Sequence, residues 1–168
     1  MTSAACQQVR HLADVRAWLT DTRRDQPLAL RRSIVDSFAM GYQAVWAMCQ
    51  AIDPSGGLWI ATFDAEHARA DRSDRGSDVC GYLIDVKAQG SRRPLMIRQH
   101  RLIRSVTYVA ALVRGRQVSF LGWIRGCDAE RHPLEPSPYA HYSNRVIPLH
   151  QLHAMATLKP EAHRVDTD

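Results

Sequence analysis

Residues 105–124, SVTYVAALVRGRQVSFLGWI, contain two apolar runs separated by a short polar segment. The first run, residues 105–113, is almost unbroken and rich in β-forming residues, which predicts a strand that is covered on both faces. The letters RGRQ contain a glycine and predict a turn into a second strand over residues 118–124. We therefore expect this stretch to form the centre of a β-sheet.

A further strand is predicted upstream, over residues 82–88, which read YLIDVKA. Successive side chains of a strand point to opposite faces, so Ile84 and Val86 are expected to enter the core. Asp85 and Lys87 would then share the other face. Lys87 is one of only two lysines among 22 basic residues, in a chain that otherwise uses arginine for positive charge.

The remaining elements are read from hydrophobic periodicity. Residues 7–20 and 28–52 place apolar side chains at helical spacing and predict two amphipathic helices. The turn DPSGG follows the second helix, after which residues 58–63, LWIATF, predict a strand. Residues 94–104 are ambiguous between a strand and a short helix. Residues 146–155 predict a short strand that runs into a helical turn.

This order of elements predicts one α/β (α+β) domain over residues 1–160, with a central mixed sheet flanked by helices and a long N-terminal helix on one face. A chain of 168 residues is large enough for one such core. The helical part is expected over 7–52, the sheet core over 58–125, and a C-terminal loop and strand over 126–158. Residues 159–168 are expected to form a flexible tail.

The composition indicates a cytoplasmic protein that does not enter a membrane. No stretch of about 18 apolar residues is present to span a bilayer, and the first residues lack the apolar core of a signal peptide. The four cysteines are widely spaced, which favours reduced thiols over a disulfide framework.

The sign of the charge changes along the chain close to Asp85. Between Asp53 and Asp85 there are seven acidic residues and three arginines, whereas residues 88–127 contain eight arginines and no acid. Such segments can gather cations and polyanions respectively. Taken without a motif, the same pattern favours an unevenly charged, solvated surface.

Asp85 and Lys87 form part of a recognisable chemical set if the chain makes a hairpin near Cys80 and Gly81. Asp78 would then lie close to Asp85 on the neighbouring strand. Two carboxylates can hold Mg²⁺, which polarises a phosphodiester and lowers the pKa of a bound water. The lysine can orient that water or neutralise the charge that develops on the phosphate.

In SDVCGYLIDVKAQ the chain resembles the PD-(D/E)xK nuclease superfamily, whose members share the restriction-endonuclease-like fold. The resemblance implies that Asp78 and Asp85 bind Mg²⁺, for which Mn²⁺ can substitute, with the backbone carbonyl of Val86 as a further ligand. It also implies that Lys87 assists the attacking water. Gln89 stands where several members carry a polar residue near the catalytic site.

The sequence departs from the family pattern around the first acid. Ser77 replaces the usual proline, and the short spacing between Asp78 and the second acid leaves Asp74 or Asp71 open as the metal ligand. Many members add an acid from the preceding helix, for which Asp36 is the candidate.

The resemblance covers about residues 28–125 and implies a nuclease that hydrolyses DNA by a Mg²⁺-activated water. RNA as the substrate and a homodimeric state stay open. Arginines of the acid-free segment are expected to hold backbone phosphates, and these are Arg92, Arg93, Arg98, Arg101 and Arg104. Two alternatives are retained: Lys87 is a structural partner that neutralises Asp85, or the fold has lost activity and binds nucleic acid or a partner protein.

Overall fold

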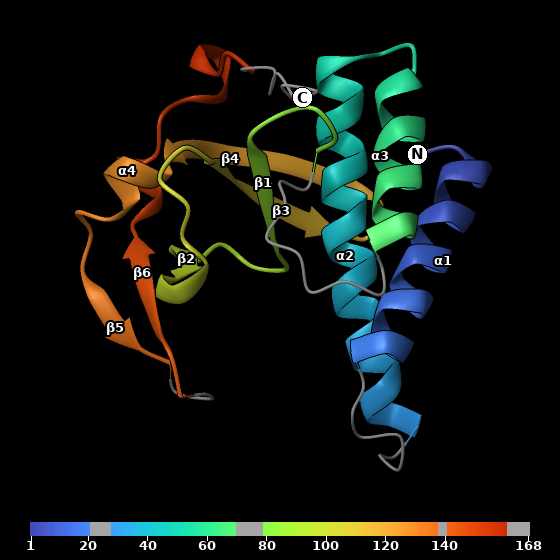
Figure 1. Ribbon diagram of the computed structural model, residues 1–168, viewed down its shortest axis with the longest axis horizontal. Coiled ribbons are helices and arrows are strands. Elements are labelled where there is room, and N and C mark those ends of the chain that lie inside the picture. Colours follow the sequence, from blue (N-terminus) through green and yellow to red (C-terminus); the bar gives the residue numbers. More distant parts are fainter. Residues whose placement is uncertain (21–27, 70–78, 138–140, 161–168) are drawn as a thin grey trace, which may run out of the picture.

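The computed structural model describes residues 1–20, 28–69, 79–137 and 141–160 and has a mixed α+β architecture (Figure 1). The helices are α1 (Ser3–Thr20), α2 (Leu28–Ile52), α3 (Gly57–Arg69) and the short α4 (Gly126–Ala129). The strands are β1 (Ile84–Gln89), β2 (Leu95–Arg98), β3 (Thr107–Arg114), β4 (Gln117–Arg125), β5 (Leu134–Pro136) and β6 (Ser143–Ile147). Short 3-10 turns follow as η1 (Gln99–Arg101), η2 (Leu149–Gln151) and η3 (Met155–Thr157).

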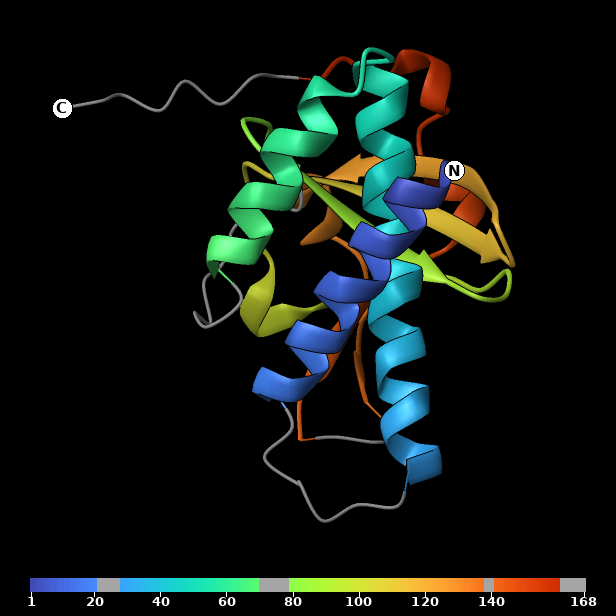
Figure 2. The same cartoon turned by 90° about the vertical axis from the view of Figure 1, so that its right-hand side faces the viewer.

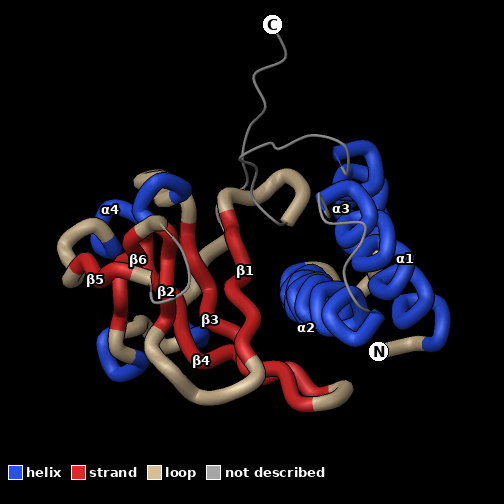
Figure 3. Tube along the Cα trace, turned by 90° about the horizontal axis from the view of Figure 1, so that it is seen from below, coloured by secondary structure: helices blue, strands red, loops and turns tan. Residues whose placement is uncertain are grey.

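The two predicted N-terminal helices are confirmed as α1 and α2. Their apolar stripes meet, and Leu12 of α1 and Met48 of α2 are each 1% exposed. Figure 2 shows α1, α2 and α3 side by side in front of the strands, and Figure 3 shows that α2 is the helix next to β1. No helix in the described ranges is long and apolar enough to cross a membrane.

The strand predicted over residues 58–63 is wrong, because this stretch forms the first half of α3. A six-residue stretch that is mostly apolar does not distinguish a strand from a helix, and the period becomes visible only over the longer segment. Trp59 and Thr62 are buried, and Phe63 is half-buried against the same core, as one face of a helix requires. The Asp53 carboxylate accepts a hydrogen bond from the Leu58 backbone N–H at 2.8 Å and satisfies the start of the helix.

The predicted central strands are confirmed as a three-stranded mixed sheet in the order β1–β3–β4. β1 pairs with β3 in parallel, with Asp85 opposite Tyr108 and Lys87 opposite Ala110. β3 and β4 form the predicted antiparallel pair, joined by a turn in which Gly115 has a φ of 57°. Their register shifts between Ala110 and Ala111, which marks a β-bulge.

A second sheet, antiparallel and in the order β2–β6–β5, packs on the opposite side of the mixed sheet from the helices (Figures 1 and 3). The stretch 94–104, whose sequence was ambiguous between a strand and a short helix, contains both elements. The strand β2 comes first and the 3-10 turn η1 follows it. The predicted C-terminal strand and helical turn are confirmed as β6 and η2.

β3 is buried on both faces, as its unbroken apolar run predicted. Val109 and Val113 face the helices and join the core formed with α1, α2 and α3. Tyr108 and Ala110 face the second sheet and join a separate core with Ile97. The molecule therefore has a helical layer, a mixed sheet and a small antiparallel sheet.

The predicted turn at Cys80 and Gly81 is present, with a φ of 74° at Gly81 and a bond from Tyr82 N–H to the Val79 carbonyl at 3.1 Å. The first arm of the predicted hairpin and most of the predicted tail lie outside the described residues.

Candidate functional site

β1 presents two polar side chains on the face that looks away from the helices. Ile84 and Val86 enter the helical core, while Asp85 and Lys87 point to the other side, as the alternation predicted. Lys87 Nζ lies 2.6 Å from Asp85 Oδ1. The Lys87 ammonium also lies 5.8 Å from the centre of the Tyr108 ring on the adjacent strand.

The Asp85 carboxylate is mostly enclosed, with 16% of its side chain exposed, compared with 39% for Lys87. Asp85 Oδ1 is fully buried and accepts no hydrogen bond of good geometry from the described residues. The Lys87 ammonium, 2.6 Å from the same oxygen, is its charge partner.

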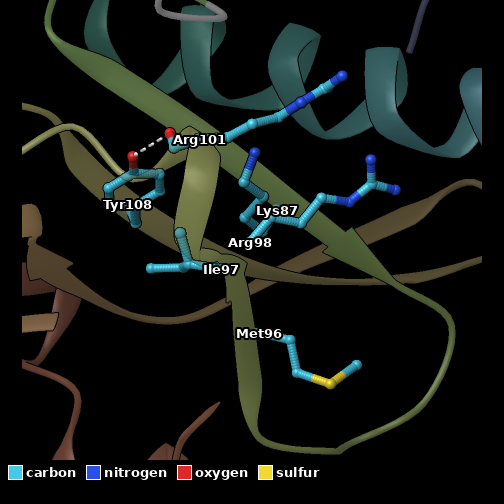
Figure 4. Close-up of a pocket in the computed structure, with 6 residues that line it drawn as sticks. All are labelled: Lys87, Met96, Ile97, Arg98, Arg101 and Tyr108. Carbon is cyan, nitrogen blue, oxygen red and sulfur yellow. Dashed lines mark hydrogen bonds between the residues drawn. The ribbon is translucent and has the colours of Figure 1, made fainter. Parts of the chain in front are cut away.

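A pocket of about 280 Å³ lies beside this pair, between β1 and the edge strand β2 (Figure 4). It is lined by Lys87, Met96, Ile97, Arg98, Arg101 and Tyr108. Four elements, β1, β2, η1 and β3, contribute to it. Figure 4 shows the guanidinium groups of Arg98 and Arg101 extending away from the Tyr108 ring.

Tyr108 forms the inner wall of the pocket and fastens η1 to the sheet. Its ring is 1% exposed. The Tyr108 hydroxyl accepts a hydrogen bond from the Ile103 N–H at 2.8 Å and donates one to the Arg101 carbonyl at 3.3 Å. These bonds hold the backbone of Arg101 next to β3, so its side chain starts from a defined position.

The structure brings together two of the five arginines predicted to contact phosphate. Arg98 and Arg101 line the pocket with Lys87. Arg104 instead forms an ion pair with Glu130 on the surface. Arg92 and Arg93 are exposed in the connection before β2 and do not line this pocket.

Gln89 shares the alternating face of β1 with Asp85 and Lys87 but is 4% exposed. Its side-chain amide donates a hydrogen bond to the Arg93 carbonyl at 3.1 Å. This bond shapes the connection from β1 to β2, which sets where β2 meets the Lys87 face. Its predicted catalytic role stays a prediction.

The candidate second carboxylates Asp78, Asp74 and Asp71 lie outside the described residues. Nearby, the Cys80 N–H donates to the Thr62 hydroxyl at 3.1 Å, which ties the chain to α3 directly before β1. Asp36 is bonded to Arg10 at 3.0 Å on α2, and α2 packs against the opposite face of β1 from Asp85. The structure therefore does not bring Asp36 to the Asp85 carboxylate.

The described part of the chain supplies an incomplete set of metal ligands. Mg²⁺ is held by oxygen atoms, of which Asp85 and the Val86 backbone carbonyl are the candidates here. No group of three or more His, Cys, Asp or Glu side chains that could hold a metal occurs within the described ranges. Asp85 Oδ1 is buried and already has the Lys87 ammonium at 2.6 Å, so the described residues alone do not form a metal site.

Sequence reasoning missed the part of the site that comes from β2 and β3. Tyr108 belongs to the apolar run 105–113, which predicts a strand covered on both faces; its burial confirms this, yet it also forms the pocket wall. Met96 and Arg98 alternate with buried Leu95 and Ile97 along β2, and this period was available in the letters LMIR. The parallel register that places Tyr108 beside Asp85 has no signal in the sequence.

Comparison with known proteins finds no protein-family model, no curated protein and no solved structure that matches this chain.

Proposed function

We propose that this protein is a metal-dependent nuclease that hydrolyses phosphodiester bonds in DNA, with the restriction-endonuclease-like core of the PD-(D/E)xK superfamily. The observation that carries the proposal is the pairing of Asp85 and Lys87 on one strand face, where Lys87 lines a pocket together with Arg98 and Arg101. A phosphate attacked by water gains negative charge in the transition state. The three cations beside the cavity can stabilise this charge, and the buried carboxylate lies next to one of them.

Each residue has a role that follows from its position. Lys87 neutralises the charge that grows on the phosphate as the P–O bond to the leaving group breaks. Arg98 and Arg101 hold phosphate groups of the strand and keep its backbone against β1. Tyr108 excludes water from the inner side of the pocket and fixes the start of the Arg101 side chain.

Asp85, the Val86 carbonyl and, by the family resemblance, Asp78 would hold the Mg²⁺ ion. When bound, this ion would supply a Lewis acid for the phosphate and a water of lowered pKa. Asp85 offers it a carboxylate whose Oδ1 lacks a well-directed hydrogen bond from the described residues. We place this activity in the cytoplasm, on the composition of the chain.

A second candidate function follows from the same ion pair. At 2.6 Å Lys87 neutralises Asp85 directly, which is also what a purely structural pair does. In that case the arginine-lined pocket belongs to a module that binds nucleic acid or a partner protein without cutting.

The deciding experiment is a cleavage assay on plasmid and linear DNA with Mg²⁺ or Mn²⁺. We expect metal-dependent cutting that Asp85→Asn and Lys87→Ala each reduce by about 100-fold or more. Lys159→Ala is the matched control, because Lys159 is exposed and is the other lysine of the chain. Thermal melting of all variants checks that they remain folded.

The two functions differ in what the variants do. Cutting that survives both substitutions would remove the catalytic assignment of Asp85 and Lys87. Salt-sensitive binding of DNA, without cutting in either metal and unchanged in both variants, would establish the binding module instead.

A further inference from the structure

The three cationic side chains that line the pocket differ in whether an acidic side chain neutralises them. Lys87 has Asp85 at 2.6 Å, so its charge is largely offset locally. Arg98 and Arg101 have no acidic partner among the described residues, whereas Arg10, Arg104 and Arg131 each have one. Within the described ranges, the pocket therefore holds about two positive charges without an acidic partner.

The Arg98 guanidinium is held at the pocket by an aromatic ring. Its central carbon lies 4.5 Å from the centre of the Tyr142 ring, and His100 contacts the same ring edge-on at 5.7 Å. A cation–π contact orients the planar guanidinium without neutralising its charge. Arg98 is therefore positioned for an anion while its donors remain available.

The pocket is closed on its inner side and lined by exposed side chains at its rim. Ile97 and Tyr108, each 1% exposed, close the inner side, and the exposed side chains of Met96, Arg98 and Arg101 form the rim. The volume of the pocket, about 280 Å³, is close to the lower limit of pockets that bind small ligands.

We propose that this pocket binds the terminal phosphate of a nucleic-acid strand, a phosphate monoester, in preference to a phosphodiester within the strand. A monoester carries close to two negative charges at neutral pH, which matches two uncompensated guanidinium groups, while a diester carries one. That the monoester belongs to a strand end rests on the proposed function. Because the pocket adjoins Asp85 and Lys87, hydrolysis would then act close to strand ends.

Binding without metal tests the pocket independently of cleavage. Short single strands of one sequence, labelled internally, would carry a 5′-phosphate, a 3′-phosphate or hydroxyl groups at both ends, and their anisotropy would be measured with a chelator present. We expect the strand with a 5′-phosphate or the strand with a 3′-phosphate to bind about tenfold more tightly than the strand with two hydroxyl ends. One or two charge-assisted hydrogen bonds account for a difference of this size. Deoxyadenosine monophosphate serves as competitor.

Substitutions of the pocket arginines test whether the preference for a phosphorylated strand end arises in this pocket. Arg98→Ala and Arg101→Ala should each abolish it, whereas Arg116→Ala should keep it, because Arg116 is exposed in the β3–β4 turn and does not line the pocket. Equal binding of all three strands, or a preference that both pocket variants retain, would overturn the proposal. Competition by the mononucleotide at the same concentration as the phosphorylated strand would also overturn it, in favour of a free nucleotide ligand.

The outcomes separate this proposal from the proposed function. DNA cutting without any end preference removes the pocket assignment and leaves the nuclease in place. An end preference without cutting in Mg²⁺ or Mn²⁺ supports the pocket and counts against the nuclease.

Discussion

Lys87 Nζ lies 2.6 Å from Asp85 Oδ1, on the face of β1 that is turned away from the helices. The two side chains are separated by one residue along the strand, and Val86 between them enters the core. The pair is therefore held by the strand itself, and its geometry does not depend on a mobile loop. Its energetic role can be separated from its catalytic one.

A double-mutant cycle measures what the contact contributes to folding. Lys87→Met should lower the free energy of unfolding by about 1 kcal/mol, a modest value because Lys87 is 39% exposed. In the Asp85→Asn background the same substitution should cost close to nothing, because no buried charge remains to be neutralised. Urea unfolding provides the four free energies. Additive effects would show that the contact contributes nothing to folding.

Tyr108→Phe should loosen the segment that carries Arg101. The substitution removes the acceptor for the Ile103 N–H and the donor to the Arg101 carbonyl. We expect a loss of about 1 kcal/mol in unfolding free energy and faster amide exchange at Ile103. Unchanged exchange at Ile103 would contradict the anchoring role of the Tyr108 hydroxyl.

Gly122→Ala should be among the more damaging small substitutions in the sheet. Gly122 has a φ of 145°, and an added Cβ would lie 2.6 Å from Leu152 Cβ and 2.8 Å from the His153 carbonyl oxygen. We expect a loss of about 3 kcal/mol from strain and overpacking. Gly41→Ala is the matched control: it lies inside α2 with nothing within 4 Å of an added Cβ, and it should gain up to about 1 kcal/mol. Chemical denaturation compares the two variants, and similar effects from both would refute the packing argument.

Cys49 should be the least reactive thiol of the chain. It is fully buried beside Thr62, and burial raises its pKa to about 11. Cys6, Cys80 and Cys127 are only half-buried and should be alkylated first in the native state, as mass spectrometry of peptides would show. Labelling of Cys49 at the same rate as these three would contradict the fold at α2.

The raised pKa of Cys49 also predicts the pH dependence of stability. Between about pH 9 and 11 the unfolded chain loses this proton and the native protein keeps it, so stability should fall as the pH rises. The contribution is on the order of 3 kcal/mol, and Cys49→Ala should flatten this part of the profile. An identical alkaline slope in the variant would assign the loss to other groups.

Asp53→Ala should destabilise the start of α3. Hydrogen bonds from Ser55 and from the Leu58 N–H lower the pKa of the Asp53 carboxyl. Its contribution is therefore present above the unfolded pKa near 3.8 and is lost as the pH falls below it. We expect a melting temperature lower by a few degrees at neutral pH, with the difference disappearing in acid. A difference that persists at acidic pH would rule out the charge as its cause.

Local patterns were sufficient for most of the elements. The unbroken run before RGRQ predicted that β3 is buried on both faces, and the alternation in LIDVK predicted which side chains of β1 leave the core. Both follow from the two-residue period of a strand, which short windows reveal. The same window length failed at LWIATF, where only the spacing of Trp59, Thr62 and Phe63 along the whole segment indicates a helix.

The sequence by itself determined most of the helices and strands, the shared face of Asp85 and Lys87, and the position of the basic segment after them. Tertiary structure alone decided that β1 runs parallel to β3, which puts Tyr108 beside Asp85. It also decided that β2 belongs to a second sheet, whose edge faces β1 and selects Arg98 and Arg101 from five similar arginines. Local periodicity carries no information on which distant strands pair, because pairing is decided by the burial of both faces of β3 between two separate cores.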